Sequence, residues 1–430
     1  MKRMILLAGL LAAVLFGQDA MATMLEDILK EKGIITDSEY EEATKSKPVD
    51  YTPGRGFTLM TPDELFKLQI GMQLTVRETY TDYFDSSKTN DNELRLRNSR
   101  FFMRGNVFSK DITYYFRTNF SDSATPSKIV QLAWINYKLL DEVQFTVGDQ
   151  AVPFTRQFLM PPWEFQLTDL SDATNTFYAG YDTGAQVWGR IKNGLLVYNL
   201  GVFGGVGAGV LRSTNNAAYV GRLTFNPLGD FPYSEADIAY TKKPLFSVGV
   251  DYFYDKLKNT FTPAIPSEKV ELAGGGTYTI PGQAASSAFE TNNYNLLWLA
   301  KEANHFTITE EVAVYQWSVD SAFKWRGFFA QAEFFGGRAQ GTVSDIVVSS
   351  YGYYGQAGYF IIPHHLEVAA RYSYVEPNSD VGNDQHREIQ GCISYYFYGH
   401  NLKLQAQYTN IDDKISGSGN QYILQANLVF

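Results

Sequence analysis

The residues of this sequence best placed to do chemistry are arginines on the polar side of an alternating pattern. Phe101, Met103 and Val107 alternate with Arg100 and Arg104. Because successive side chains of a strand point to opposite faces, these two arginines share one face. The arginines in polar positions of predicted strands are Arg77, Arg100, Arg104, Arg117, Arg190 and Arg222. A guanidinium group stays charged and recognises carboxylate and phosphate groups, so these residues predict a basic wall that attracts anions.

A long connection supplies acidic groups that could face this wall. Residues 150–180 are too many for a simple hairpin, and they include Pro153, Pro161 and Pro162. Long ordered loops in compact structures are usually functional. We expect this loop to fold into the space enclosed by the strands, where its acids would oppose the arginines in a transverse field. The acidic residues are Glu164, Asp169 and Asp172. In the simpler alternative, the arginines only pair with neighbouring carboxylates and hold the wall together.

The histidines and the single cysteine do not suggest a catalytic or metal centre. Two histidines lie in a predicted tight turn, and three lie near strand ends, without a nucleophile motif or metal-ligand spacing around them. Cys392 is alone, which excludes an internal disulfide and a paired-cysteine metal or haem motif. We expect the histidines to be structural, and we expect no enzyme activity, no metal and no cofactor. The histidines are His305, His364, His365, His386 and His400.

The elements that must position these residues are strands of period two. In one segment Ile70, Met72 and Leu74 alternate with Gln73 and Thr75. Such alternation gives one apolar and one polar face. Many strands of this kind in a row, with no helices between them, favour a closed barrel over a soluble sandwich. Similar alternation returns in residues 112–121, 143–147, 246–254, 366–374 and 402–408.

The lengths of the connections support the same architecture. Tight turns at 109–111 and 140–142 alternate with longer polar loops at 86–92 and 205–216. Short periplasmic turns and longer external loops are typical of outer-membrane barrels. We therefore predict an all-β transmembrane antiparallel β-barrel of about 16 strands. The alternative is about 18 strands, because residues 294–301 could add a hairpin to a long external loop.

The composition fits a barrel that crosses a lipid bilayer. Aromatic residues make up 15% of the 430 residues, and charged residues make up 19%. A membrane barrel needs lipid-facing apolar residues, aromatic girdles and a polar interior in one short-period pattern. No segment has the run of about 18 or more apolar residues that a transmembrane helix requires. The chain carries 36 basic and 46 acidic residues, which argues against nucleic acid as a partner. The expected partners are outer-membrane lipid and small solutes.

The two ends of the chain predict export to the bacterial outer membrane. Lys2 and Arg3 precede a short apolar run, and the small-residue sequence Ala20-Met21-Ala22 follows it. This order is typical of a secretory signal peptide, which we expect to be cleaved after Ala22. The last strand ends in Phe430, and it resembles the terminal strand that outer-membrane barrels present to their assembly machinery.

These features divide the chain into four predicted parts. Helical spacing and a capping box indicate a short helical segment in the periplasm, either a plain appendage or a contact between subunits. A stretch rich in proline and glycine follows as a linker. The predicted parts are a signal peptide at 1–22, the helical segment at 23–50, the linker at 51–65 and the barrel at 66–430.

Several motifs together resemble one known family. LRLRNSRFFMRG from Leu94, VGDQAVPFTRQFL from Val147 and YDTGAQVWGRI from Tyr181 are similar to segments of the phosphate-selective porin O and P family, and they occur in the family's order. The resemblance runs from about residue 66 to the carboxy terminus. It implies a 16-stranded, trimeric barrel whose third external loop folds into the lumen. It also implies that residues 226–243 are a long periplasmic connection without strands.

The resemblance adds one candidate residue, but it does not assign the transported solute. Arg156 stands in the Val-Pro-Phe stretch of the matching loop and is a further candidate for anion binding. Phosphate-selective members rely on clustered lysines and arginines, and a lysine cluster is not matched residue by residue in this sequence. The resemblance therefore implies the porin scaffold without assigning phosphate as the solute.

The function expected from these patterns is passive diffusion through a water-filled pore. In a barrel of this size side chains cannot fill the interior, and selectivity depends on pore width and on charges that face the lumen. We expect small hydrophilic solutes to pass, with anions as the favoured class. One alternative is a channel specific for phosphate or another oxyanion. Another is a scaffold that sheathes a partner such as a cytochrome.

Overall fold

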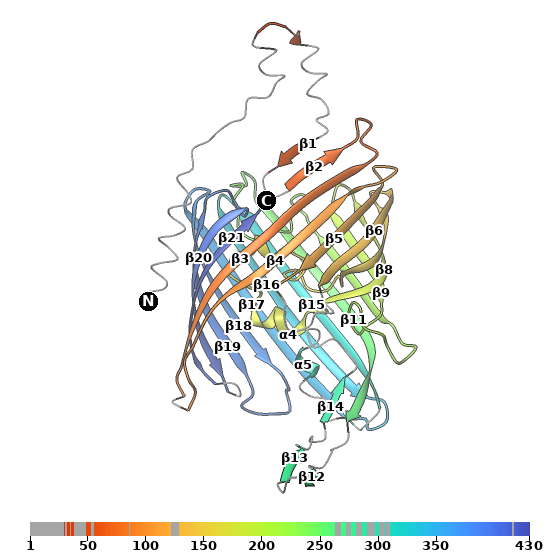
Figure 1. The fold of residues 1–430 in the computed structure, drawn as a ribbon, viewed down its shortest axis with the longest axis vertical. Coiled ribbons are helices and arrows are strands. Elements are labelled where there is room, and N and C mark those ends of the chain that lie inside the picture. Colours follow the sequence, from red (N-terminus) through yellow and green to blue (C-terminus); the bar gives the residue numbers. More distant parts are fainter. Residues whose placement is uncertain are drawn as a thin grey trace.

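The computed structural model shows a barrel of antiparallel strands (Figure 1). The predicted signal peptide, residues 1–22, and most of the predicted helical segment lie outside the described residues. Within the described part of the chain, no helix is both long and apolar enough to cross a membrane. The structure describes residues 30, 32–34, 36–37, 49–52, 56–85, 87–121, 129–262, 268–271, 277–280, 286–289, 297–300, 306, 310–414 and 417–430.

Sixteen strands follow one another around the barrel, and the last strand pairs with the first to close it. At the closure, Val429 lies opposite Gln73 and Gly419 lies opposite Tyr83. The prediction of an antiparallel barrel of about 16 strands is confirmed. The barrel strands are β3 (Lys67–Tyr83), β4 (Asp91–Asn106), β5 (Ile112–Asn119), β6 (Val130–Leu140), β7 (Val143–Ala151), β8 (Tyr181–Ile191), β9 (Leu196–Phe203), β10 (Ala218–Phe225), β11 (Leu245–Thr262), β15 (Glu311–Trp325), β16 (Phe328–Gly341), β17 (Val347–Ile362), β18 (Leu366–Glu376), β19 (His386–Tyr396), β20 (Leu402–Asp413) and β21 (Gly419–Val429).

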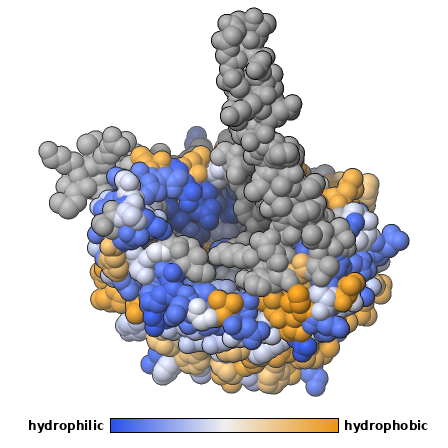
Figure 2. Space-filling model, turned by 90° about the horizontal axis from the view of Figure 1, so that it is seen from below, coloured by the Kyte–Doolittle hydropathy of each residue, from blue (hydrophilic) through white to orange (hydrophobic). Residues whose placement is uncertain are grey.

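The alternation along each strand sorts side chains between the outside and the interior of the barrel. In β17, Tyr351 and Tyr359 are exposed on the outside, whereas Ser350 and Gln356 are buried inside. Figure 2 shows hydrophobic side chains around the outside of the barrel and a hydrophilic hollow within it. This arrangement is the reverse of a soluble protein, because apolar groups face outward. It suits a wall that has lipid on one side and polar groups on the other.

Further elements lie outside the ring of sixteen strands. One extra strand, β2, pairs with the start of β3 and so extends the wall beside the closure. The loop after β11 contains a short helix, α5 (Leu297–Ala300), so this described part of 294–301 does not form the suggested extra hairpin. The remaining strands are β1 (Val49–Thr52), β2 (Gly56–Met60), β12 (Glu268–Glu271), β13 (Thr277–Ile280) and β14 (Ser286–Phe289).

Two insertions enter the barrel interior. The first, residues 152–180, is named the inner loop and contains η2 (Pro162–Glu164) and α4 (Asp172–Phe177). The second, residues 226–244, is named the periplasmic connection. It contains no strand, as the family resemblance implied. Apolar side chains of the inner loop, of α5 and of the wall form a core inside the barrel. Its large members include Phe154, Phe177, Trp298 and Phe335.

Candidate pore and its lining

Polar side chains of the barrel wall hold the inner loop in place. The backbone N–H groups of Arg156 and Gln157 each donate a 2.8 Å hydrogen bond to the Glu333 carboxylate. Lys403 Nζ donates to the carbonyl oxygen of Phe165 at 2.5 Å. Buried peptide groups need partners, and a segment inside a barrel cannot turn all of its peptide groups to water. The wall supplies these partners from β16 and β20, so the loop has a defined position.

The periplasmic connection packs against the inner loop. Glu235 is fully buried and accepts hydrogen bonds from Gln157 Nε2 at 2.8 Å and from the Gln166 backbone N–H at 2.6 Å. The backbone N–H of Glu235 donates to the Glu164 carbonyl oxygen at 3.1 Å. One carboxylate thus joins the two insertions, which together fill part of the barrel interior.

A buried ionic network lies where these insertions meet the wall. Arg222 donates to Asp251 at 2.6 Å and to Asp320 at 2.7 Å, and Arg156 Nη1 lies 3.3 Å from Asp320. Each of these four side chains is at most 1% exposed. The ring of Tyr233, from the periplasmic connection, lies against both guanidinium groups. We call this side of the interior, bounded by β10, β11 and β15 to β20, the filled half.

A cavity of about 780 Å³ remains between the inner loop and the opposite wall, formed by β3 to β8. We call this side the open half. Among the described residues that line the cavity there are five lysines and arginines and no aspartate or glutamate. The basic residues are Lys67, Arg104, Lys110, Arg117 and Lys138. The charged residues that line the cavity are therefore all basic, although the whole chain is acidic. Two of them form ion pairs with carboxylates outside the lining: Lys110 with Glu64, and Lys138 with Asp141 at 2.5 Å.

Neighbouring side chains fix the two arginines of the cavity wall. Arg104 Nε donates to Gln69 Oε1 at 2.7 Å. Arg117 Nη2 donates to the Tyr181 hydroxyl at 2.9 Å, and the guanidinium group lies over the Tyr181 ring at 5.5 Å from its centroid. These contacts use only part of the hydrogen-bonding capacity of each guanidinium group, which has five N–H donors. Both arginines occupy defined positions on the cavity lining.

Aromatic and apolar groups line the rest of the cavity. Tyr115 packs against Trp134, with ring centroids 5.7 Å apart. Trp188 Nε1 lies 3.0 Å from Asn136 Oδ1, which fixes the indole against the wall. The inner loop contributes apolar side chains from Phe158 to Pro161 on the facing side. The cavity therefore presents charged groups and aromatic surface side by side.

Beside the cavity, one carboxylate of the inner loop meets two arginines of the wall. Asp169 forms ion pairs with Arg77 and with Arg97, the latter at 3.1 Å. Arg77 also donates to Gln425 Oε1 at 2.8 Å. Removal from water would raise the pKa of the Asp169 carboxyl group, but the two guanidinium groups outweigh this effect and hold its pKa well below its usual range. The ion pair between loop and wall is therefore maintained across ordinary pH.

Comparison with known proteins places this barrel in a family. The family model described as phosphate-selective porin O and P matches residues 66–260 and 284–427, which is most of the chain. The chain belongs to the phosphate-selective porin O and P family. It is an outer-membrane porin.

The porin is also similar to one further protein sequence and, in fold, to solved outer-membrane barrels. The porin is 21% identical to an uncharacterized protein of Aquifex aeolicus (strain VF5), over 100% of this chain and 99% of that protein. In fold it is similar to the anion-selective porin from Comamonas acidovorans, with a TM-score of 0.56 and 8% identity over 84% of this chain and 99% of that chain. It is also similar to the trimer form of OmpT of Vibrio cholerae, with a TM-score of 0.52 and 11% identity over 84% and 99% of the two chains. At these identities the structural likeness shows the fold alone.

The structure separates the seven predicted arginines of the porin into three groups. Arg104 and Arg117 line the cavity. Arg77 and Arg100 are buried on the inner face of β3 and β4, where Arg100 Nη1 lies 3.2 Å from Gln73 Oε1. The other three candidates, like Arg77 and Arg100, do not line the cavity. They are Arg156, Arg190 and Arg222.

The predictions for these three arginines need correction. Arg156 and Arg222 point into the interior, but the periplasmic connection and the buried carboxylates cover them. Arg190 is 42% exposed at the periplasmic end of β8, where it pairs with Asp230 at 2.6 Å. Strand alternation indicates the face of a side chain, but it cannot indicate whether another segment fills the space beyond that face.

The three acidic candidates of the inner loop also lie in different surroundings. Asp169 faces the arginines, as described above. Asp172 does not; its carboxylate lies 3.9 Å from His386 Nε2 on β19. Glu164 is partly buried, and this burial raises the pKa of its carboxyl group, while Lys324 and Lys403 act against the shift. The predicted row of acids along the arginine wall is therefore reduced to one residue.

Sequence reasoning missed several residues of the cavity lining. Trp134 and Lys138 share the inward face of β6 with Asn136, and Trp188 shares the inward face of β8 with Gln186. The signal was present, because tryptophan at polar positions of an alternating strand faces the lumen. Arg97 was also missed, because the register between β3 and β4 shifts beside it and interrupts the alternation.

Proposed function

We propose that this porin lets small anions diffuse passively through the open half of the barrel. One observation carries the proposal: lysines and arginines line the cavity, and no described aspartate or glutamate does. Selectivity in a channel depends on charges facing the pore, because ions respond to the local field. The surplus of acidic residues over the whole chain therefore does not oppose an anion preference.

The aromatic lining refines the class of solute. Indole and phenol rings offer flat apolar surface, and guanidinium groups bind carboxylates. Because Trp134 and Trp188 lie on the same wall as Arg117, we expect solutes with a carboxylate and a small apolar part to pass more readily than equally charged polar ones. Inorganic phosphate is the alternative solute.

The proposal includes the assembly and the processing of the chain. We propose that the porin assembles as a homotrimer, after cleavage of the signal peptide behind Ala22. The chain's own insertions occupy the filled half and leave a cavity of about 780 Å³, which is far too small to sheathe a folded partner such as a cytochrome. We assign the chain no enzymatic role.

Reversal potentials across planar lipid bilayers test the proposal. Purified porin in a potassium chloride gradient should give a potential of the sign expected for chloride permeation. Arg104→Ala and Arg117→Ala should each shift the potential toward zero, and the double variant should shift it further. Arg190→Ala is the matched control, since this residue lies outside the cavity. A cation-selective wild type, or an unchanged potential in the double variant, would contradict an anion preference set by these residues.

Added solutes separate the expected solute class from its alternative. Benzoate should carry more current than acetate in the wild type, and Trp188→Ala should reduce that difference. Conductance that saturates with phosphate but not with benzoate would favour an oxyanion-specific channel.

A further inference from the structure

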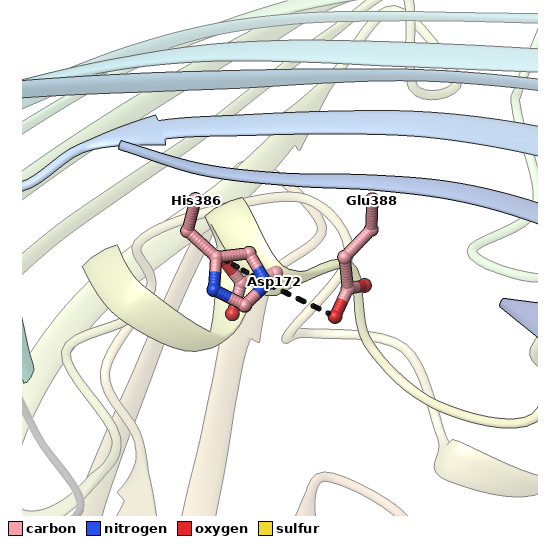
Figure 3. A group of neighbouring side chains, drawn as sticks. All are labelled: Asp172, His386 and Glu388. Carbon is pink, nitrogen blue, oxygen red and sulfur yellow. Dashed lines mark hydrogen bonds and ion pairs between the residues drawn. The ribbon is translucent and has the colours of Figure 1, made fainter. Parts of the chain in front are cut away.

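A cluster of one histidine and three carboxylates joins the inner loop to the barrel wall. Its members come from three elements: Asp172 from α4, His386 and Glu388 from β19, and Asp413 from β20. Figure 3 shows the side chains of Asp172 and Glu388 next to the His386 ring. We call these four residues the His386 cluster. None of them belongs to the cavity lining described above.

Both ring nitrogens of His386 face carboxylate oxygens. Nδ1 lies 2.9 Å from Asp413 Oδ2, at hydrogen-bonding distance. Nε2 lies 3.3 Å from Glu388 Oε1 and 3.9 Å from Asp172 Oδ2. A neutral imidazole has one N–H and one lone pair, so if Nδ1–H donates to Asp413, the Nε2 lone pair points at two carboxylates. That arrangement is favourable only when a cation, a proton or a metal ion, occupies the space at Nε2.

The ligand atoms are spaced as a metal site requires. One oxygen of Asp172, one oxygen of Glu388 and a nitrogen of His386 all lie within 4.8 Å of one another. Metal–ligand bonds to zinc are about 2.0–2.2 Å long for these atom types, so two ligands of one ion lie roughly 3 to 4 Å apart. The two distances measured from Nε2 fall in that range. Small side-chain rotations therefore suffice to bring all three atoms onto one ion.

Asp413 supplies the partner that metal-bound histidines normally have. A histidine that ligates a metal through one ring nitrogen usually donates its other N–H to a carboxylate, which fixes the ring and strengthens the ligand. Asp413 holds Nδ1 in this way. The second oxygen of Glu388 accepts from Gln390 Nε2 at 3.0 Å, which orients that carboxylate too. The side chains that would bind the ion and the groups that orient them are thus both present.

Charge and access also favour a cation. Three carboxylates face one imidazole, and the neighbouring Arg387 pairs with Asp412 instead. The side chains of the cluster are 13 to 22% exposed, so an ion can reach them from solvent. One nitrogen and two carboxylate oxygens suit divalent transition ions such as Zn²⁺ better than Mg²⁺ or Ca²⁺, which prefer oxygen ligands alone.

We propose that the His386 cluster binds a divalent transition-metal ion and that this ion fastens the inner loop to β19. Asp172 lies three residues after Asp169, and Arg371 holds the carbonyl oxygens of Asp169 and Leu170 at 3.0 Å each. A metal bond at Asp172 therefore fixes the part of the loop that presents Asp169 to the arginine wall. This inference is independent of which solutes the porin admits.

Zn²⁺ titration of the purified, folded porin in detergent tests the proposal, with calorimetry as the measurement. Wild-type protein should bind one Zn²⁺ per chain. His386→Ala and Asp172→Asn should each abolish that binding, and Asp413→Asn should weaken it by about 10–100-fold, the usual effect of removing such a supporting group. His365→Ala is the matched control; its ring contacts the Tyr396 carbonyl in a turn far from the cluster. Unchanged migration of the unheated barrel on a gel verifies that each variant is folded.

The outcomes are distinguishable. If the wild type does not bind Zn²⁺ at millimolar concentration, a proton occupies the cluster and the metal site is excluded. If His386→Ala binds Zn²⁺ as tightly as the wild type, the ion lies elsewhere. If Asp172→Asn alone keeps full affinity, the inner loop contributes no ligand and the ion does not fasten it. A Zn²⁺-dependent rise in unfolding temperature, seen in the wild type and absent in His386→Ala, would support the proposal in a second measurement.

Discussion

Arginines point inward in both the filled half and the open half of this barrel, but their surroundings differ. Arg222 points inward from β10, and Arg117 points inward from β5. Arg222 meets two buried carboxylates and is covered by an inserted segment, whereas Arg117 meets a tyrosine hydroxyl and a cavity. What differs is the chain that lies opposite each side chain. In this porin, the inserted segments decide which arginines hold the structure together and which face a solute.

This difference has an energetic side. In the filled half, removing charges from water is costly, and only complete pairing offsets the cost. In the structure two arginines, Arg156 and Arg222, are set against the carboxylates of Asp251 and Asp320. In the open half the cavity remains in contact with solvent, and the two arginines that line it donate to neutral groups, Arg104 to Gln69 and Arg117 to the Tyr181 hydroxyl. Stability should therefore depend on the first group and ion preference on the second.

The largest expected effect comes from breaking the buried network. Arg222→Met should destabilise the barrel by about 3–5 kcal/mol, because it leaves the Asp251 and Asp320 carboxylates buried without their main partner. The midpoint of urea unfolding, followed by circular dichroism in lipid vesicles, measures this change.

A second substitution isolates the cause of that loss. Arg222→Met combined with Asp251→Asn removes one of the uncompensated charges, and it should recover part of the stability. If the single variant unfolds at the wild-type midpoint, the buried network does not contribute to stability and the comparison between the two halves fails.

A smaller effect is expected where the two insertions meet. Glu235→Ala removes the acceptor of the Gln157 amide and of the Gln166 backbone N–H. Leaving a buried donor without a partner costs about 1–3 kcal/mol. Because these contacts hold the inner loop beside the filled half, we expect lower stability together with larger and noisier single-channel currents. Glu235→Gln is the control, since its carbonyl oxygen can still accept one hydrogen bond. Currents identical to the wild type would show that this contact does not position the loop.

The fold could be predicted from the sequence because its signals are local. The period-two alternation around Ile70 and Met72 and the tight turn at 109–111 depend only on neighbouring residues. Each strand must turn one face to lipid, so one segment suffices to assign its inward and outward residues. The loop after β11 was harder to interpret, because a short apolar stretch such as 297–300 can form either a strand or a turn of helix.

The site could be predicted only in part, because it depends on contacts between distant segments. Strand alternation predicts that Arg104 and Arg222 both point inward. Their surroundings differ because residues 226–244 cover Arg222, whereas Arg104 lines the cavity. Asp172 was expected beside the arginines, but it lies in α4 and faces His386 on β19. No local pattern encodes how a loop of this length crosses a barrel, so these placements required the three-dimensional structure.

A change in ion preference, without a large loss of stability, is expected at the junction of loop and wall. Asp169→Asn removes the carboxylate that pairs with Arg77 and Arg97, and it should increase the preference for anions in reversal-potential measurements. The low pKa of Asp169 sets the pH dependence. A carboxyl group with a depressed pKa stays charged at every pH above the usual pKa of a carboxyl group. It becomes neutral, and its ion pairs are lost, only when the pH falls below that usual pKa.

In the wild type, Asp169 should stay charged between about pH 5 and 8, as an ordinary carboxyl group does. Asp169 should therefore cause no change in the reversal potential over this interval. The variant should differ from the wild type throughout this interval. A wild-type potential that moves toward that of Asp169→Asn as pH falls from about 8 to 5 would contradict the strong pairing.

The smallest effect is expected at the edge of the barrel. Arg190 shares the inward parity of β8 with Trp188, but it pairs with Asp230 in the open, with both side chains at least 42% exposed. Exposed ion pairs contribute about 0–1 kcal/mol, because water screens the charges and ordering two flexible side chains costs entropy. Arg190→Met should therefore change the urea midpoint by much less than Arg222→Met does, and it should leave the reversal potential unaltered. Both substitutions replace an arginine with methionine. A large loss of stability at the exposed Arg190 would therefore mean that burial of charge does not explain the loss expected at Arg222 in the filled half.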